Sequence, residues 1–358
     1  MERVEVAIVG GGPAGAACAI VCAESGLRTV VIEREKFPRE KVCGDCLNPA
    51  CWPVLRRLGA ADAVRQMPHG RLNVVEFIGI GGVRVKVDLP SDENAEIAVK
   101  RSLFDHLMLQ RARAAGAEIV EEAMVARVEK ARWGDWKIDV VRDKITAPVL
   151  VAADGRNSTV ARLRNLLPRV QRERIALQTH IPLPRGFGNR VVLQFLAEGY
   201  SGQAPVNDLE LNLCLVGRGA DVEPLKDWAS NQFGISSDHP WRTITPLTRS
   251  PLGAAHDKLF LIGDAARVVE PFTGEGIYYA LRSGELAAQA VRAVIQNDDA
   301  TAAVERFVQL QREMYRGRLW INELARAAVL WPRVGSGFVR LAKVYPGVLR
   351  LLTGKIVR

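Results

Sequence analysis

The stretch VEVAIVGGGPAGAACAIVCAESGLRTVVIERE, residues 4–35, holds the strongest structural signal in the chain. Its first part, residues 4–10, is an apolar run that predicts a buried strand, and residues 28–35 predict a second strand. Between them, a glycine-rich turn leads into a run of small residues that is typical of a closely packed helix, and Gly26 ends that helix. The stretch therefore predicts a βαβ unit of about thirty residues.

The glycines of this turn have the spacing of a dinucleotide-binding loop, because Gly10, Gly12 and Gly15 follow the pattern GxGxxG. The first permits a tight turn, the second lets a pyrophosphate approach the backbone, and the third lets the helix pack against the strand. Glu33, which lies 21 residues after Gly12, can accept hydrogen bonds from a ribose. A glycine-rich turn without a ligand is the alternative, but the strand, helix and acid together favour a nucleotide.

A second strand–glycine–helix pattern lies at residues 259–291. An apolar run ends at Gly263-Asp264, and Gly274 and Gly276 then open a helix-like segment. Glycines let a backbone approach a ligand closely, and a helix N-terminus offers unpaired N–H groups to it. An aspartate at a strand end can accept hydrogen bonds from hydroxyls. This segment therefore indicates a ligand that is both electron-rich and polyhydroxylated.

The remaining pattern predicts an α/β fold with a Rossmann-type, three-layer nucleotide-binding domain in separated segments, residues 1–70, 95–165 and 251–300. Short strands and turn signals predict a mostly antiparallel β region at 71–94 and 166–250, with little helix periodicity. Residues 301–358 have helical periodicity and form a basic C-terminal region. We find no internal repeat.

Composition describes an ordinary globular protein, with 48% hydrophobic and 25% charged residues. No run of eighteen apolar residues is present, so we expect no membrane-spanning helix. The N-terminus leads directly into a strand and does not resemble a signal peptide. The six cysteines do not have the pattern of a disulfide framework in a secreted protein, so we expect the reducing cytoplasm as the location. A peripheral position at the membrane is a further possibility within that location.

The charge is concentrated in the C-terminal region. Residues 316–358 hold nine Lys/Arg and one acid, which is +8 of the net charge of +9. Two amphipathic stretches lie there, the first with Trp320, Ile321, Leu324, Ala328 and Trp331 expected on one face, and the second with Phe338, Leu341, Tyr345, Leu349, Leu352 and Ile356. A packed helix is one interpretation, and a surface for an anionic membrane or an acidic carrier is the other. We expect no nucleic-acid partner, because no binding motif accompanies the charge.

Four motifs in order resemble the FAD-binding fold of the p-hydroxybenzoate hydroxylase superfamily. They are the glycine loop, Arg101-x-x-Phe104-Asp105, Asp154-Gly155 and Gly263-Asp264, and they span residues 6–290. The resemblance implies FAD as the cofactor, with Asp264 accepting hydrogen bonds from the ribitol chain. It also implies that the helix opening at Gly274–Ile277 stabilises charge on the reduced flavin.

The resemblance extends the cofactor site to further residues. It implies that Arg101 lies near the flavin or pyrophosphate, and that Asp154 lies near the pyrophosphate or a nicotinamide. The expected cofactor-binding residues are Gly10, Gly12, Pro13, Ala14, Gly15, Glu33, Arg34, Cys43, Gly44, Arg101, Val125, Asp154, Gly155, Gly263, Asp264, Pro271, Gly274, Gly276 and Ile277. We name no catalytic residue and expect no metal.

Two segments narrow the resemblance to the geranylgeranyl reductase group, namely PFTGEGIYYA at 271–280 and KVCGD at 41–45. This implies an FAD-dependent reduction or dehydrogenation of a hydrophobic, isoprenoid- or polyketide-like substrate. The alternatives are a monooxygenase that hydroxylates an aromatic or polyketide substrate, and a non-enzymatic flavin-binding redox sensor. No second GxGxxG follows a strand, so we expect NAD(P)H or another donor to bind only transiently.

Cys43 and Cys46 leave three interpretations open. They can form a redox disulfide that exchanges electrons with the flavin. They can be half of a metal site, although no second pair has zinc spacing. The third interpretation is that Cys43 lines the flavin and Cys46 packs nearby.

Overall fold

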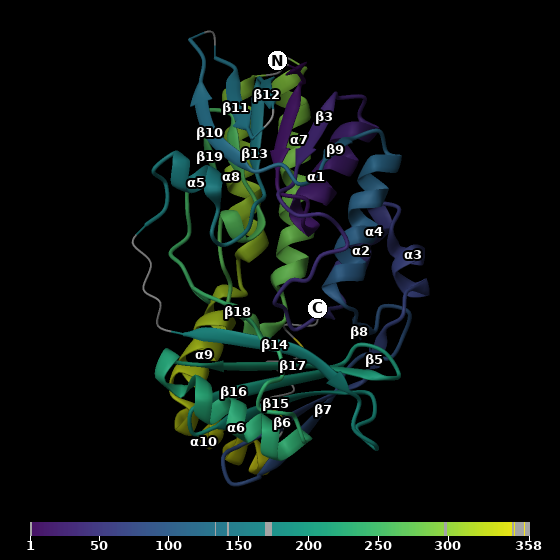
Figure 1. The fold of residues 1–358 in the computed structure, drawn as a ribbon, viewed down its shortest axis with the longest axis vertical. Helices are drawn as coiled ribbons and strands as arrows, with labels where there is room; N and C mark the ends of the chain where they lie inside the picture. The colour runs from purple at the N-terminus through teal and green to yellow at the C-terminus, as the bar shows by residue number, and fades with distance from the viewer. Residues whose placement is uncertain are drawn as a thin grey trace.

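The computed structural model describes residues 2–132, 134–141, 143–168, 174–296 and 299–345, with Gly347 and Gly354. Figure 1 shows the parallel sheet with its helices in the upper part, and the seven-stranded sheet in the lower part, where α6, α9 and α10 also lie. In this described part of the chain, no helix is both long and apolar enough to cross a membrane.

The parallel sheet brings together strands that lie far apart in the sequence. Its order is β19-β20-β13-β2-β3-β9, and only β19 and β20 pair antiparallel. Every residue of β2, β3 and β13 is buried, as expected for a sheet covered on both faces. The bounds are β2 (Val6–Val9), β3 (Thr29–Ile32), β9 (Glu118–Val120), β13 (Val149–Ala152), β19 (Ala255–His256) and β20 (Leu259–Leu261).

Alternate residues of these strands face two different layers. Ile8 and Phe260 pack in the cluster that includes the helices, whereas Ala7 packs in the cluster that contains Trp136. The helical layer holds α1 (Pro13–Glu24), α4 (Arg101–Ala114), α7 (Gly276–Ile295) and α8 (Ala300–Tyr315), and the other layer holds β1 (Glu2–Arg3), β10 (Val125–Lys130), β11 (Trp136–Val140), β12 (Asp143–Ala147) and α5 (Thr159–Leu163). The predicted three-layer domain is confirmed.

A small connecting region joins the two sheets. It contains α2 (Cys51–Arg57), α3 (Ala61–Gln66) and a three-stranded sheet of β4 (Cys46–Leu47), β8 (Glu96–Ala98) and β5 (Gly70–Leu72), with β8 in the centre. Gly70 lies so close to the seven-stranded sheet that an added Cβ would be 1.8 Å from the Pro205 carbonyl oxygen.

The seven-stranded sheet is antiparallel except where β15 pairs parallel to β6. Its order is β18 (Arg242–Ile244), β14 (Ile175–Pro182), β17 (Glu210–Gly217), β16 (Gly199–Pro205), β15 (Arg190–Leu196), β6 (Val74–Ile78) and β7 (Arg84–Asp88). The predicted antiparallel region is confirmed, but it also holds a helix that the sequence did not indicate, α6 (Val222–Phe233). That helix buries only Leu225 and Ala229, so its apolar signal is weak.

The C-terminal region is helical to Val344, as α9 (Leu319–Leu330) and α10 (Pro332–Val344). The expected single apolar face of the first stretch is wrong, because Ile321 is buried whereas Trp320 and Trp331 are exposed. Trp331 follows the last residue of α9, and its non-helical backbone takes it off the helical face. In the second stretch, Leu349, Leu352 and Ile356 lie outside the described residues. Short helical turns complete the fold: η1 (Gly219–Asp221), η2 (Gly263–Ala265) and η3 (Pro271–Thr273).

Candidate functional site

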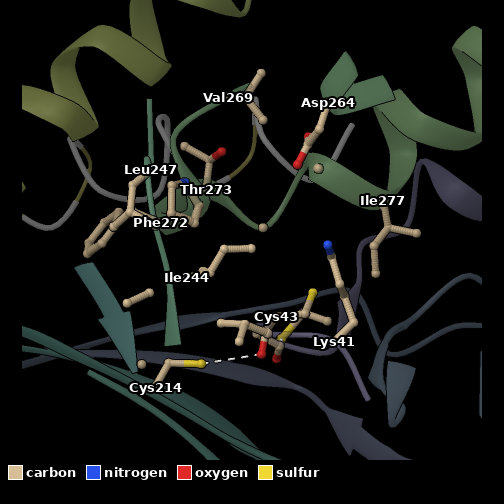
Figure 2. Close-up of a pocket in the computed structure, with 18 of the residues that line it drawn as sticks. Lys41, Cys43, Cys214, Ile244, Leu247, Asp264, Val269, Phe272, Thr273 and Ile277 are labelled. Carbon is tan, nitrogen blue, oxygen red and sulfur yellow. Dashed lines mark hydrogen bonds between the residues drawn. The ribbon is translucent and has the colours of Figure 1, made fainter. Parts of the chain in front are cut away.

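A cavity of about 650 Å³ lies between the parallel-sheet domain and the seven-stranded sheet. Its wall includes the loop after β2, residues 39–44 and Cys46, the start of α7, one face of the seven-stranded sheet, and parts of α9 and α10. Figure 2 shows Asp264, Thr273 and Ile277 on one side of this space and Lys41, Cys43 and Cys214 on the other.

Seventeen of the nineteen predicted cofactor-binding residues line this one cavity. They are Gly10, Gly12, Pro13, Ala14, Glu33, Arg34, Cys43, Gly44, Arg101, Val125, Asp154, Gly155, Asp264, Pro271, Gly274, Gly276 and Ile277. Gly15 and Gly263 lie behind the wall, where they allow close packing. At Gly15, an added Cβ would lie 1.9 Å from the carbonyl oxygen of Gly10. At Gly263, an added Cβ would lie 3.0 Å from the Cβ of Ala14. The structure thus brings the motifs together, and the contacts of each residue with a cofactor stay predictions.

The glycine loop has the shape that a bound pyrophosphate requires. Gly10 has a φ of +103°, which favours glycine. At Gly12 an added Cβ would meet only the Arg39 guanidinium, at 3.7 Å, so the space over this backbone is open. Glu33 accepts hydrogen bonds from the backbone N–H of Gly11 at 2.7 Å and of Glu35 at 2.9 Å. It therefore also holds the loop itself, beside any contact with a ribose.

Besides Arg34, four cationic side chains line the cavity near this loop, namely Arg39, Lys41, Arg101 and Arg156. Arg101 and Arg39 share the buried carboxylate of Asp105, at 2.7 and 2.8 Å. Burial, and then the charges of Arg101, Arg156 and Arg39, lower the pKa of Lys41 to about 8. An anionic group in the cavity would relieve this repulsion. Of the cations that line the cavity, our sequence prediction included Arg34 and Arg101, although basic residues around the KVCGD segment were a visible signal.

The two predicted aspartates serve different local structures. Asp264 points into the cavity (Figure 2), and Arg156 donates to it at 3.3 Å. Asp154 accepts from the N–H groups of Thr159 and Val160, at 2.6 and 3.1 Å, and so caps α5. Within the described chain, its Oδ1 is buried without a hydrogen-bond partner. Burial raises the pKa of Asp154.

Three thiols gather at the floor of the cavity. Cys43, Cys46 and Cys214 all line it, and the Cys214 thiol donates to the Cys43 carbonyl oxygen at 3.3 Å. All three are free thiols, and burial raises the pKa of each. A raised pKa disfavours the thiolate that disulfide exchange needs, which favours packing over redox chemistry. Among the described residues, no group of three or more His, Cys, Asp or Glu side chains is placed to hold a metal ion.

Two further acids near the thiols were missed by sequence reasoning. Asp45 is buried, and its backbone has the left-handed conformation, with a φ of +60°. Its carboxylate oxygen Oδ2 lies 2.8 Å from His180 Nε2. Glu96, on β8, lines the cavity and is only 9% exposed. Burial raises its pKa to about 7.

The rest of the cavity is an apolar chamber. Phe272, from the turn before α7, lies with its ring centroid 5.2 Å from that of Tyr200 and 5.7 Å from that of Phe195. The chamber is completed by side chains of the sheet and of the C-terminal helices, including Val75, Phe77, Leu193, Ile321, Leu324, Phe338 and Val339. One cavity therefore joins a polar, cationic region at the glycine loop to an apolar region against the seven-stranded sheet.

These features fit FAD. The open backbone at Gly12 and the four cations suit a pyrophosphate, and the buried, unpaired Oδ1 of Asp154 suits a polar ligand. At Gly274 and Gly276, which line the cavity before α7, an added Cβ would meet no atom within 4 Å, so a flat ring can approach that backbone.

Comparison with known proteins agrees with this arrangement. The family described as "FAD binding domain" matches residues 3–177. A menaquinone reductase from Mycolicibacterium smegmatis is 30% identical over 314 residues, covering 80% of this chain and 76% of that protein. A digeranylgeranylglycerophospholipid reductase from Methanopyrus kandleri is 25% identical, covering 87% of each. A solved flavin-dependent brominase shares the fold, with a TM-score of 0.79, 21% identity, and coverage of 99% of this chain and 94% of that one.

Proposed function

The chain belongs to the FAD-dependent oxidoreductases of the p-hydroxybenzoate hydroxylase superfamily, with geranylgeranyl reductases among its relatives, and on that premise we propose that it reduces C=C bonds of a long hydrophobic, isoprenoid-like substrate. We further propose that NAD(P)H, bound transiently at the same cavity, supplies the electrons.

The apolar chamber that continues from the flavin motifs is the observation that carries this proposal. Phe272 stands where the two regions meet, since it belongs to the turn before α7 and packs on Tyr200 and Phe195 of the sheet. A chain lying in the chamber would reach that turn from an apolar side. The names of two relatives, one a quinone reductase and one a reductase of a geranylgeranyl lipid, support the same substrate class.

The chain's own residues would bind and orient the reactants. Gly12, Arg39 and Arg101 would hold the pyrophosphate, Glu33 a ribose, and Asp264 the ribitol hydroxyls. The N-terminal N–H groups of α7 would stabilise negative charge on the cofactor. When bound, FAD would supply hydride transfer, and the apolar wall would exclude water from the reacting bond.

The test is an anaerobic reaction of the purified protein with FAD, a chemical reductant or NAD(P)H, and a polyprenyl quinone or geranylgeranyl lipid. The product should gain two hydrogen atoms per reduced bond by mass spectrometry. A Phe272→Ala variant should retain FAD and lose turnover, because it opens the chamber without changing the glycine loop.

The same reaction in air separates this proposal from the monooxygenase. Incorporation of an oxygen atom, with no gain of hydrogen under anaerobic conditions, would overturn the reductase. If the denatured protein releases only NAD, the assignment of FAD as the cofactor is wrong.

A further inference from the structure

The described chain carries most of its exposed large apolar side chains on α9, α10 and the residues that flank them. Seven of the eleven lie between Trp320 and Tyr345, namely Trp320, Trp331, Val334, Phe338, Leu341, Val344 and Tyr345. Isolated exposed apolar residues are ordinary, but a contiguous group marks an interaction site.

On α10 the exposed apolar residues form one stripe. Val334, Phe338 and Leu341 follow one another at intervals of four and three residues, which places them on one helical face, and Tyr345 follows the last residue of the helix. The neighbouring face of the helix is already used, since Gly335, Val339 and Ala342 are buried. At Gly335 an added Cβ would lie 2.4 Å from the Phe195 ring, so this face of α10 is pressed against β15.

The charge around the stripe has one sign. Residues 324–345 contain Arg326, Arg333, Arg340 and Lys343, and no acidic residue. All four cations are exposed. An apolar stripe flanked by cations is the pattern of a helix that lies in the interface of an anionic bilayer.

The stripe also coincides with the opening of the cavity. Phe338 and Leu341 line the cavity and are at the same time 43% and 49% exposed. Figure 1 places α9 and α10 at the end of the molecule opposite the N-terminus. The apolar chamber therefore reaches the surface at the stripe.

We propose that the exposed face of α10, with Trp331 before the helix and Lys343 in its last turn, docks on an anionic lipid bilayer and admits a lipid substrate to the cavity between Phe338 and Leu341. The entry of substrate rests on the proposed function, whereas docking does not. An acidic carrier protein would use the cations without needing the exposed apolar stripe, so the bilayer is the better fit.

The test is sedimentation of the full-length protein with phosphatidylcholine vesicles that contain or lack phosphatidylglycerol. Wild type should bind the anionic vesicles at low salt and lose binding as salt rises. Arg333→Gln with Lys343→Gln should weaken binding roughly 30-fold, because each charge near the surface contributes about fivefold. Val334→Ser with Val344→Ser should weaken it in both low and high salt.

A matched control has the same change of charge elsewhere. Arg306→Gln with Arg312→Gln removes two exposed cations from α8 and should leave vesicle binding unchanged. Absence of wild-type binding at low salt, or an equal loss in this control, would overturn the proposal. Retention on an acidic protein without vesicle binding would overturn it in favour of a carrier.

Turnover distinguishes docking from catalysis. None of the four substituted α10 residues lines the cavity, so both α10 variants should reduce substrate normally in detergent and slowly from vesicles. Vesicle binding without turnover in any medium would refute the proposed function and leave docking intact. Equal rates from vesicles for wild type and both variants would overturn entry through this face.

Discussion

The two regions of the cavity wall are built by different means. The glycine loop is shaped by backbone, where Gly10 has a positive φ and Gly15 touches the preceding turn. The apolar chamber is shaped by side chains such as Val75, Phe195 and Phe338, which are brought together from three distant parts of the chain. A backbone-built region tolerates almost no added atoms, whereas a side-chain-built region can repack. Substitutions should therefore act unequally on the two.

The largest effect is expected at Gly15. Gly15→Ala would place a Cβ 1.9 Å from the Gly10 oxygen, so the helix must move away from the strand. We expect loss of bound flavin and destabilisation by about 4 kcal/mol or more. Flavin absorbance and thermal unfolding measure both. Gly337→Ala on α10, where a Cβ meets nothing within 4 Å, is the control and should be neutral or slightly stabilising.

The next effect is expected at a buried ion pair that links the seven-stranded sheet to the segment before α7. Arg174, just before β14, contacts Glu270, just before η3, at 2.7 Å, and both are almost fully buried. Glu270→Ala should cost about 3–5 kcal/mol, because it leaves a buried charge without this partner. Urea unfolding measures the loss. Asp62→Ala at an exposed pair with Arg65 should cost less than about 1 kcal/mol, and a similar loss at both sites would contradict the argument.

Glu96 should make stability depend on pH. Burial raises its pKa from 4.5 to about 7, so the folded state holds the proton more tightly than the unfolded state. The free energy of unfolding should therefore fall by up to about 3 kcal/mol as pH rises from the unfolded to the folded pKa. Glu96→Gln should remove that fall, as measured by urea unfolding at about pH 5 and about pH 8. If the free energy of unfolding of Glu96→Gln still falls with pH as it does in the wild type, another titratable group is responsible for the fall.

The smallest effect is expected at Cys46. Its thiol contacts the Gly44 carbonyl oxygen at 3.3 Å, a contact that a serine hydroxyl can also make. If Cys46 only packs, Cys46→Ser should change stability by less than about 1 kcal/mol and leave flavin reoxidation intact. A thiol count after aerobic purification should find Cys43 and Cys46 reduced. Complete loss of reoxidation in Cys46→Ser would support the redox interpretation instead.

Much of the nucleotide-binding domain was predictable because its signals are local. Gly10, Gly12 and Gly15 fall within six residues, and the backbone geometry requires glycine at Gly10, which has a positive φ, and at Gly15, where a Cβ would clash. The segment around Lys41 shows the limit of this reasoning. Its cations gather because α4 brings Arg101 beside the loop, and no local pattern reports that proximity.

The sequence by itself determined the parallel-sheet domain, the FAD family and the basic, amphipathic character of the C-terminal region, because periodicity, glycine spacing and charge are properties of short segments. Only the tertiary structure decided how those segments face one another. It paired β6 with β15, more than a hundred residues later in the chain, and it turned Ile321 inward while leaving Trp331 exposed. It also placed Phe338 and Leu341 in the cavity wall, since a long-range packing contact depends on shapes that are far apart in the sequence.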